Sequence, residues 1–215
     1  MKISRRNAVR TWMGYGVEDF LIAFEVLEKW PWYRPFFIEQ GLEKICKAYL
    51  IGKKSSEYRN VGYKKARKRI HQIAQSLGHQ VSRLVTRLAS YVPTVSEVIG
   101  RNYDGYSGRS VLMVLEKAYT ETRYPVDEPI SLMFPIPGTR KKMHWDPLGS
   151  SSLQKCAFAI SKEVIDTSER QFGVQFPSRN PFSHKIDDHT WERFCRLLLG
   201  RENLCEKCRS EMEIQ

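Results

Sequence analysis

A run of basic residues in the first half of the chain has the types and spacing that bind polyanions. The run holds Lys64, Lys65, Arg67, Lys68 and Arg69, and Arg83 and Arg87 follow in the same periodic segment. A stripe of this kind neutralises several phosphates and gives salt-dependent binding to nucleic acid. Tyr63 and Tyr91 flank the segment, and their rings would stack on exposed bases. The alternative interpretation is a solvated face that aids solubility.

The excess positive charge of the chain lies entirely in its first 91 residues. The formal net charge is +11; residues 1–91 hold 18 Lys and Arg against 7 Asp and Glu, whereas residues 92–215 are balanced. Such asymmetry, together with a pI near 9.5, favours a polyanionic partner such as nucleic acid.

Two cysteines near the end of the sequence, Cys205 and Cys208, have the spacing of half a zinc site. No second Cys-x2-Cys exists, so His184, His189 and Cys195 are the remaining residues that would complete four ligands. A thiol pair in a frayed tail is the other interpretation. We expect no metal and no cofactor.

The elements that must position these groups are helices. Residues 35–50 place apolar side chains at spacings of three, four and seven behind Pro35, which fits the first turn of a helix. Glu43 and Lys47 are four residues apart and are expected to pair on the opposite face. Gly41 weakens a helix, so its presence predicts that another helix packs closely there.

Periodicity predicts further helices on both sides of this segment. The first of these helices covers residues 17–27, and residues 51–62 form a loop. A long helical segment then covers residues 70–91 and is closed by Pro93. Gly78 either divides this segment into two helices or marks a tight contact. Residues 102–108 read as a turn in which Ser107 or Ser110 caps a helix over 111–119. Residues 130–136 are the only strand expected, in a small hairpin around 137–138. Two helices follow, one after residues 150–152 and the last over 188–199, where Asp187 and Asp188 suit an N-cap and Gly200 ends the helix.

The length of 215 residues suits one domain, or a domain with an appendage. No run of about 18 apolar residues occurs, so we expect no membrane span. The five cysteines are an odd number, which argues against a secreted disulfide framework and predicts a cytoplasmic protein.

Three ordered segments, residues 34–50, 78–84 and 119–125, together resemble the HEPN (higher eukaryote and prokaryote nucleotide-binding) superfamily. The first resembles its helix with a Gln, Glu and Lys-Ala face, the second its Gly-His helix start at His79, and the third the ending Arg123-Tyr124-Pro125 found in one branch. The resemblance implies an all-α, antiparallel bundle of four or five helices over residues 14–171, with a loop or hairpin insertion over 125–149 and a C-terminal helical extension over 172–215. It also implies a homodimer.

The catalytic branch of that superfamily needs an Arg and a His separated by four to six residues. Within the bundle, His79 has no Arg at that distance. The pair Arg179 and His184 has the spacing, and the Asn after the Arg matches, but it lies beyond the region of resemblance and encloses Pro181. If the chain cuts RNA, we expect Arg179 to stabilise phosphate charge and His184 to act as acid and base, without a metal. A loop whose Arg caps or pairs locally is the alternative.

The sequence therefore leaves two functions open. The first is an RNA- or nucleotide-binding protein in a defence or toxin–antitoxin system, with endoribonuclease activity undecided. The second is a non-catalytic helical module that partners another protein, such as a nucleotidyltransferase. The residues expected to contact nucleic acid are Lys64, Lys65, Arg67, Lys68, Arg69, His79, Arg83, Arg87 and Arg123.

Overall fold

The structure, a computed structural model, describes residues 2–25, 33–123, 133–135, 142–144, 151–177 and 179–200. These residues form an all-α helical bundle, as expected. The eight helices are α1 (Arg5–Glu25), α2 (Arg34–Lys53), α3 (Tyr63–Ser76), α4 (Val81–Ala89), α5 (Pro93–Gly100), α6 (Gly108–Arg123), α7 (Ser151–Phe172) and α8 (Asp188–Leu199), with a 3-10 turn at Ser55–Glu57. The chain divides into two compact units, residues 1–174 and 175–215.

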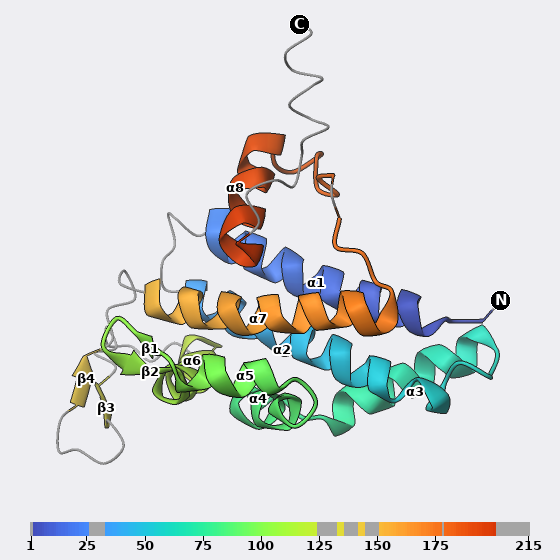
Figure 1. Ribbon diagram of the computed structural model, residues 1–215, viewed down its shortest axis with the longest axis horizontal. Coiled ribbons are helices and arrows are strands. Elements are labelled where there is room, and N and C mark those ends of the chain that lie inside the picture. Colours follow the sequence, from blue (N-terminus) through green and yellow to red (C-terminus); the bar gives the residue numbers. More distant parts are fainter. Residues whose placement is uncertain are drawn as a thin grey trace, which may run out of the picture. The chain divides into compact units, whose positions relative to one another are not determined.

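Helix α2 is the centre of the first unit. It contacts α1, α3, α4, α6 and α7, and α1 runs beside it in the opposite direction (Figure 1). Pro35 occupies the first turn of α2, as predicted, and the helix continues past the expected end to Lys53 because Ile51 and Gly52 are also buried. A helix buried on most of its circumference packs against neighbours on several sides, so α2 sets the positions of the helices around it.

Close backbone approach explains two glycines where α1 meets α2. A Cβ added at Gly41 would lie 2.5 Å from the ring of Phe20, and one at Gly16 would lie 2.7 Å from the carbonyl oxygen of Gly41. Phe20 is fully buried and packs edge to face on Phe158 of α7. The prediction that a helix packs tightly against Gly41 is confirmed.

The long segment expected over 70–91 is two helices, because Gly78 adopts a left-handed conformation with φ 74° between α3 and α4. Pro93 does not close the segment: it opens α5, where its missing N–H costs no hydrogen bond. The first helix begins at Arg5 instead of Val17, since Ala8, Val9 and Met13 are also buried and extend the helix toward the N-terminus.

Two short antiparallel hairpins accompany the helices. β3 (Met133–Pro135) pairs with β4 (Lys142–His144), which agrees with the expected hairpin. β1 (Asn102–Tyr103) and β2 (Tyr106–Ser107) form another, so the expectation of a single strand region was wrong. The short β1–β2 pair closes around Asp104 and Gly105, both with positive φ, and Ser107 caps α6 by accepting from the N–H of Ser110.

The second unit holds α8 as predicted. Asp187 accepts a hydrogen bond from the N–H of Thr190, and Gly200 ends the helix in the left-handed conformation. Trp191 is its central buried side chain, stacked on Phe176 and in contact with Phe182 and Phe194. The charged tail that follows lies outside the described residues.

Among the helices that the structure describes, none is both long enough and apolar enough to cross a bilayer.

Candidate nucleic-acid interface

Helix α3 presents its cations to solvent. Its sequence contains no Asp or Glu, and Lys64, Lys65, Arg67 and Lys68 are exposed without an ion pair to any described residue. Its opposite face buries Ala66, Ile70, Ile73 and Ala74. The amphipathic pattern therefore holds one face in the core and leaves the cations available to a polyanion.

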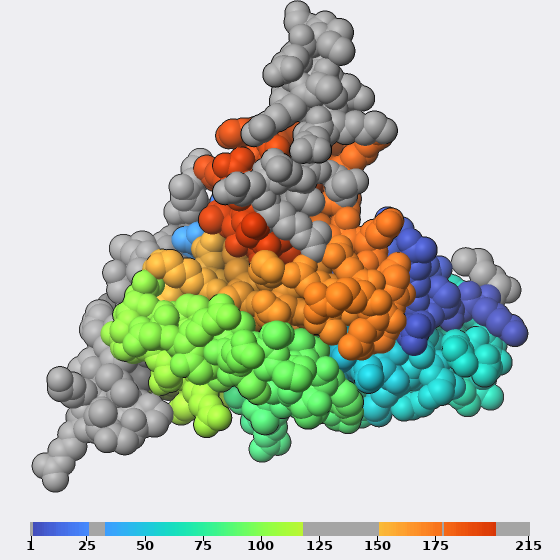
Figure 2. All heavy atoms as spheres, in the orientation of Figure 1, coloured from blue at the N-terminus to red at the C-terminus, as the bar shows by residue number. Residues whose placement is uncertain are grey.

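A small apolar cluster fixes α3 against the first turns of α1. Ala8 of α1, Ile51 of α2 and Tyr58 pack with the buried face of α3, and Ile3 and Trp12 cover the edge. The start of α1 (dark blue) adjoins α2 and α3 (cyan to turquoise) at one end of the unit (Figure 2). This end adds the exposed Arg5, Arg6 and Arg10 to the cations of α3.

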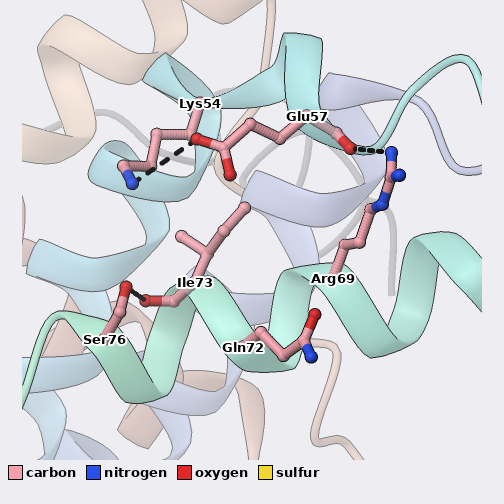
Figure 3. A pocket seen from close by; sticks show the side chains of 6 residues that line it. All are labelled: Lys54, Glu57, Arg69, Gln72, Ile73 and Ser76. Carbon is pink, nitrogen blue, oxygen red and sulfur yellow. Dashed lines mark hydrogen bonds and ion pairs between the residues drawn. The ribbon is translucent and has the colours of Figure 1, made fainter.

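Arg69 differs from the other cations of α3. It is half-buried, and its guanidinium donates to the carbonyl oxygen of Glu57 at 2.6 Å. It lines a hollow of about 510 Å³, where Lys54 pairs with Glu57 and Ser76 donates to the carbonyl of Ile73 (Figure 3). Lys54, Glu57, Arg69 and Ser76 all make contacts within the protein, so Arg69 serves to position the turn after α2.

Arg83 and Arg87 are exposed on α4, one turn apart. The start of α4 is tied to α6, because the N–H of Ser82 donates to Glu116 at 2.7 Å. Tyr91, predicted as a stacking residue, is 42% exposed, but its ring already contacts Tyr49 and the ammonium group of Lys53. Arg123 is the last residue of α6, and its side chain lies outside the described part of the structure.

Helix α2 buries three charged side chains on a side that was expected to face solvent. Glu39, Glu43 and Lys47, at successive turns, are 1%, 4% and 2% exposed. Lys47 donates to Glu43 at 2.8 Å, so the predicted pair forms, but its predicted exposed position was wrong. Charges in such a place need partners, and Glu43 finds one in Lys47 of the same helix. Beside this group, the partly exposed Lys44 of α2 pairs with Asp19 of α1.

Glu39 is the most deeply buried of these three charged side chains. Burial is the main cause that raises the pKa of Glu39 from its ordinary value of 4.5 to about 8, and the negative charges of Glu43 and Glu116 contribute to the same rise. A hydrogen bond that Gln40 donates at 2.8 Å acts in the opposite direction. Near neutral pH, Glu39 is therefore protonated in most molecules.

His79 connects this buried group to the surface. Its Nδ1 lies 3.2 Å from both carboxylate oxygens of Glu43, while its side chain is 67% exposed. A proton on Nδ1 is directed at the carboxylate, which leaves Nε2 facing outward to accept a proton. A carboxylate that orients an exposed imidazole in this way is a general acid–base arrangement. The spacing of residues in the sequence did not predict the contact between Glu43 and His79, since the two residues are far apart along the chain.

Arg179 and His184 are both exposed, in the loop that precedes α8. Asn180 holds this loop, accepting from the N–H of Phe182 and donating to the carbonyl of Ile186. The Asn after the Arg thus has a structural role in the turn, and the catalytic assignment of the pair stays a prediction.

The described cysteines Cys46, Cys156 and Cys195 are buried, and Cys205 and Cys208 lie outside the described residues. Within the described ranges, no three His, Cys, Asp or Glu side chains are grouped to hold a metal.

In comparisons with known proteins, no family model, no curated protein and no solved structure matches this chain at a significant level.

Proposed function

We propose that this chain is a HEPN-like protein that binds RNA or nucleotides through the exposed cations of α3 and the start of α1. One observation carries the proposal: α3 exposes four cations, has no acidic residue, and leaves all four without an ion pair to a described residue. Cations held by a rigid helix and not neutralised by neighbours are the expected footprint of phosphate binding.

Binding to a fluorescein-labelled single-stranded RNA, followed by anisotropy over a salt series, tests this proposal. The double variant Lys64→Gln/Lys68→Gln removes two exposed cations one turn apart. If each contacts a phosphate, the slope of log affinity against log salt falls by about 0.7 per contact, or roughly 1.4 in total.

The matched control is Arg101→Gln/Arg109→Gln, which removes two exposed cations beside the β1–β2 hairpin. We expect this variant to keep the wild-type slope. Equal slopes for the two double variants would contradict the assigned surface. No binding by the wild-type protein at about 50 mM salt, where phosphate contacts are strong, would contradict RNA binding altogether and favour the protein-partner function.

The Glu43–His79 pair favours a second candidate function, RNA cleavage. In this reaction the 2′-oxygen bonds to the adjacent phosphorus while the bond to the 5′-oxygen breaks. Nε2 of His79 takes the 2′-hydroxyl proton and returns it to the departing 5′-oxygen. The products are a 2′,3′-cyclic phosphate and a 5′-hydroxyl. Glu43 acts through His79 as a positioning residue.

Incubation of labelled RNA with the protein in EDTA tests cleavage. We expect His79→Asn to lower the rate by about a hundredfold or more while RNA binding is retained. His184→Asn serves as the control for a second exposed histidine. A loss in His184→Asn with none in His79→Asn would assign the reaction to the Arg179–His184 loop instead. No cleavage by the wild type would contradict the enzymatic candidate and leave RNA binding standing.

The homodimer and the cytoplasmic defence or toxin–antitoxin role belong to the same proposal. Their support is the resemblance of residues 34–50, 78–84 and 119–125 to the HEPN pattern. Light scattering of the purified chain tests the dimer, with a mass of twice 25.2 kDa as the expected result and the monomer mass as the contradicting one.

A further inference from the structure

A groove between α1 and α3 is lined by aromatic and basic side chains. Its volume is about 460 Å³, within the range of small-molecule sites, and its walls come from the first three turns of α1 and the first half of α3. Because the apolar cluster beneath it joins these two helices, both walls are held in place.

Aromatic side chains form part of both walls. Tyr15 is 54% exposed and Tyr63 is 44% exposed, while Trp12 is partly buried against the cluster. Large rings left in water on rigid helices offer flat surfaces that lose little conformational entropy on binding. Stacking of a nucleobase covers such a ring and is favourable for every base.

The polar residues of the groove include three basic side chains. Lys2, Arg67 and His71 contribute to its walls, and none of the described residues that line it is Asp or Glu. None of the six aromatic and basic side chains makes a hydrogen bond or ion pair with a described residue. The hollow beside Lys54 differs, since Glu57 is among its lining residues, Lys54 pairs with Glu57, and Arg69 donates to the carbonyl oxygen of Glu57.

We propose that this groove holds unpaired bases of single-stranded RNA, with a base stacked on Tyr63 or Tyr15 and the adjoining phosphate on Arg67. The inference rests on the proposed RNA binding and specifies its substrate class. The aromatic rings would stack on unpaired bases, and the basic side chains would bind the phosphates that connect those bases. A duplex would leave the rings unused, because its bases are stacked on one another.

The test compares two labelled strands of equal length, an oligoadenylate and an abasic ribose-phosphate strand that has the same charge without bases. We expect wild-type protein to bind the oligoadenylate at least tenfold more tightly, since the stacking of a single base on an aromatic ring is enough for a change of that size. Tyr63→Leu, which keeps apolar bulk, should lose about tenfold for the oligoadenylate and nothing for the abasic strand. Tyr33→Leu is the matched control, because Tyr33 is 47% exposed and lies at the start of α2.

Equal binding of the two strands by the wild type would overturn the inference. Unchanged oligoadenylate binding in a Tyr15→Leu/Tyr63→Leu protein would do so too, while the salt response of the Lys64→Gln/Lys68→Gln variant still decides RNA binding independently. Thermal unfolding followed by circular dichroism verifies that each variant is folded.

Discussion

Helices α2 and α3 place charged residues at the same spacing in opposite environments. In α2, Glu43 and Lys47 are buried and paired with each other, and His79 adds a contact from outside the helix. In α3, Lys64 and Lys68 have the same spacing but are exposed and have no ion pair with a described residue. The charges of α2 are part of the interior, whereas those of α3 are available to a ligand.

This difference separates stability from function. Removing one partner of a buried pair leaves a charge in a medium that solvates it poorly, so α2 should be sensitive to substitution. Removing an exposed cation changes little in the folded chain, so α3 should tolerate substitution, and under the proposed function the affinity for RNA should fall.

The largest expected effect is that of Lys47→Ala. This change leaves Glu43 buried without its ammonium partner, and we expect the free energy of unfolding to fall by about 3–5 kcal/mol. Urea denaturation measures the loss, with Lys68→Ala as the exposed control. A loss below about 1 kcal/mol would show that the pair is hydrated or dispensable.

The second effect is a pH dependence set by Glu39. Its pKa is near 8 in the folded chain and near 4.5 when unfolded, so between these values the folded state binds more protons. Stability then falls as pH rises through this window, with a slope of up to about 1.4 kcal/mol per pH unit. In Glu39→Gln this contribution should disappear. Parallel profiles for the two proteins in urea at pH 5, 6 and 7 would contradict the assignment.

The third effect compares two glycines. In Gly41→Ala the new methyl group meets the buried ring of Phe20, and we expect a loss of about 1–3 kcal/mol. Gly62, at the start of α3, has open space around it, so Gly62→Ala should change stability by less than about 0.5 kcal/mol. Similar melting temperatures for the two variants would show that α1 and α2 are less closely packed.

The smallest effect is expected for Lys64→Gln/Lys68→Gln. Like charges at this spacing repel, so their removal should raise the free energy of unfolding by a few tenths of a kcal/mol. A loss above about 1 kcal/mol in urea denaturation would mean that these side chains support the fold.

Local signals predicted much of the fold. Pro35, Ser107, Asp187 and Gly200 each act within a few residues of their own position, and each sets a helix end as expected. Pro93 shows the limit of such signals: the sequence did not distinguish a proline after a helix from one in the first turn of the next, and packing of Val95, Val98 and Ile99 accompanies the start of α5.

The candidate sites divide in the same way. The cations of α3 were predictable, because their exposure follows from one amphipathic pattern within one helix. The Glu43–His79 contact and the groove between α1 and α3 depend on residues brought together from distant segments, such as Tyr15 and Tyr63. Periodicity carries no information about which helix lies next to which.

Photo-crosslinking of a 5-iodouridine-containing single-stranded RNA, mapped by mass spectrometry, is the most direct test of the proposed RNA-binding surface. We predict crosslinks to Trp12, Tyr15 or Tyr63, and their loss when unlabelled oligoadenylate competes. Crosslinks confined to the Arg179–His184 loop or to residues away from α1 and α3 would contradict the assigned surface.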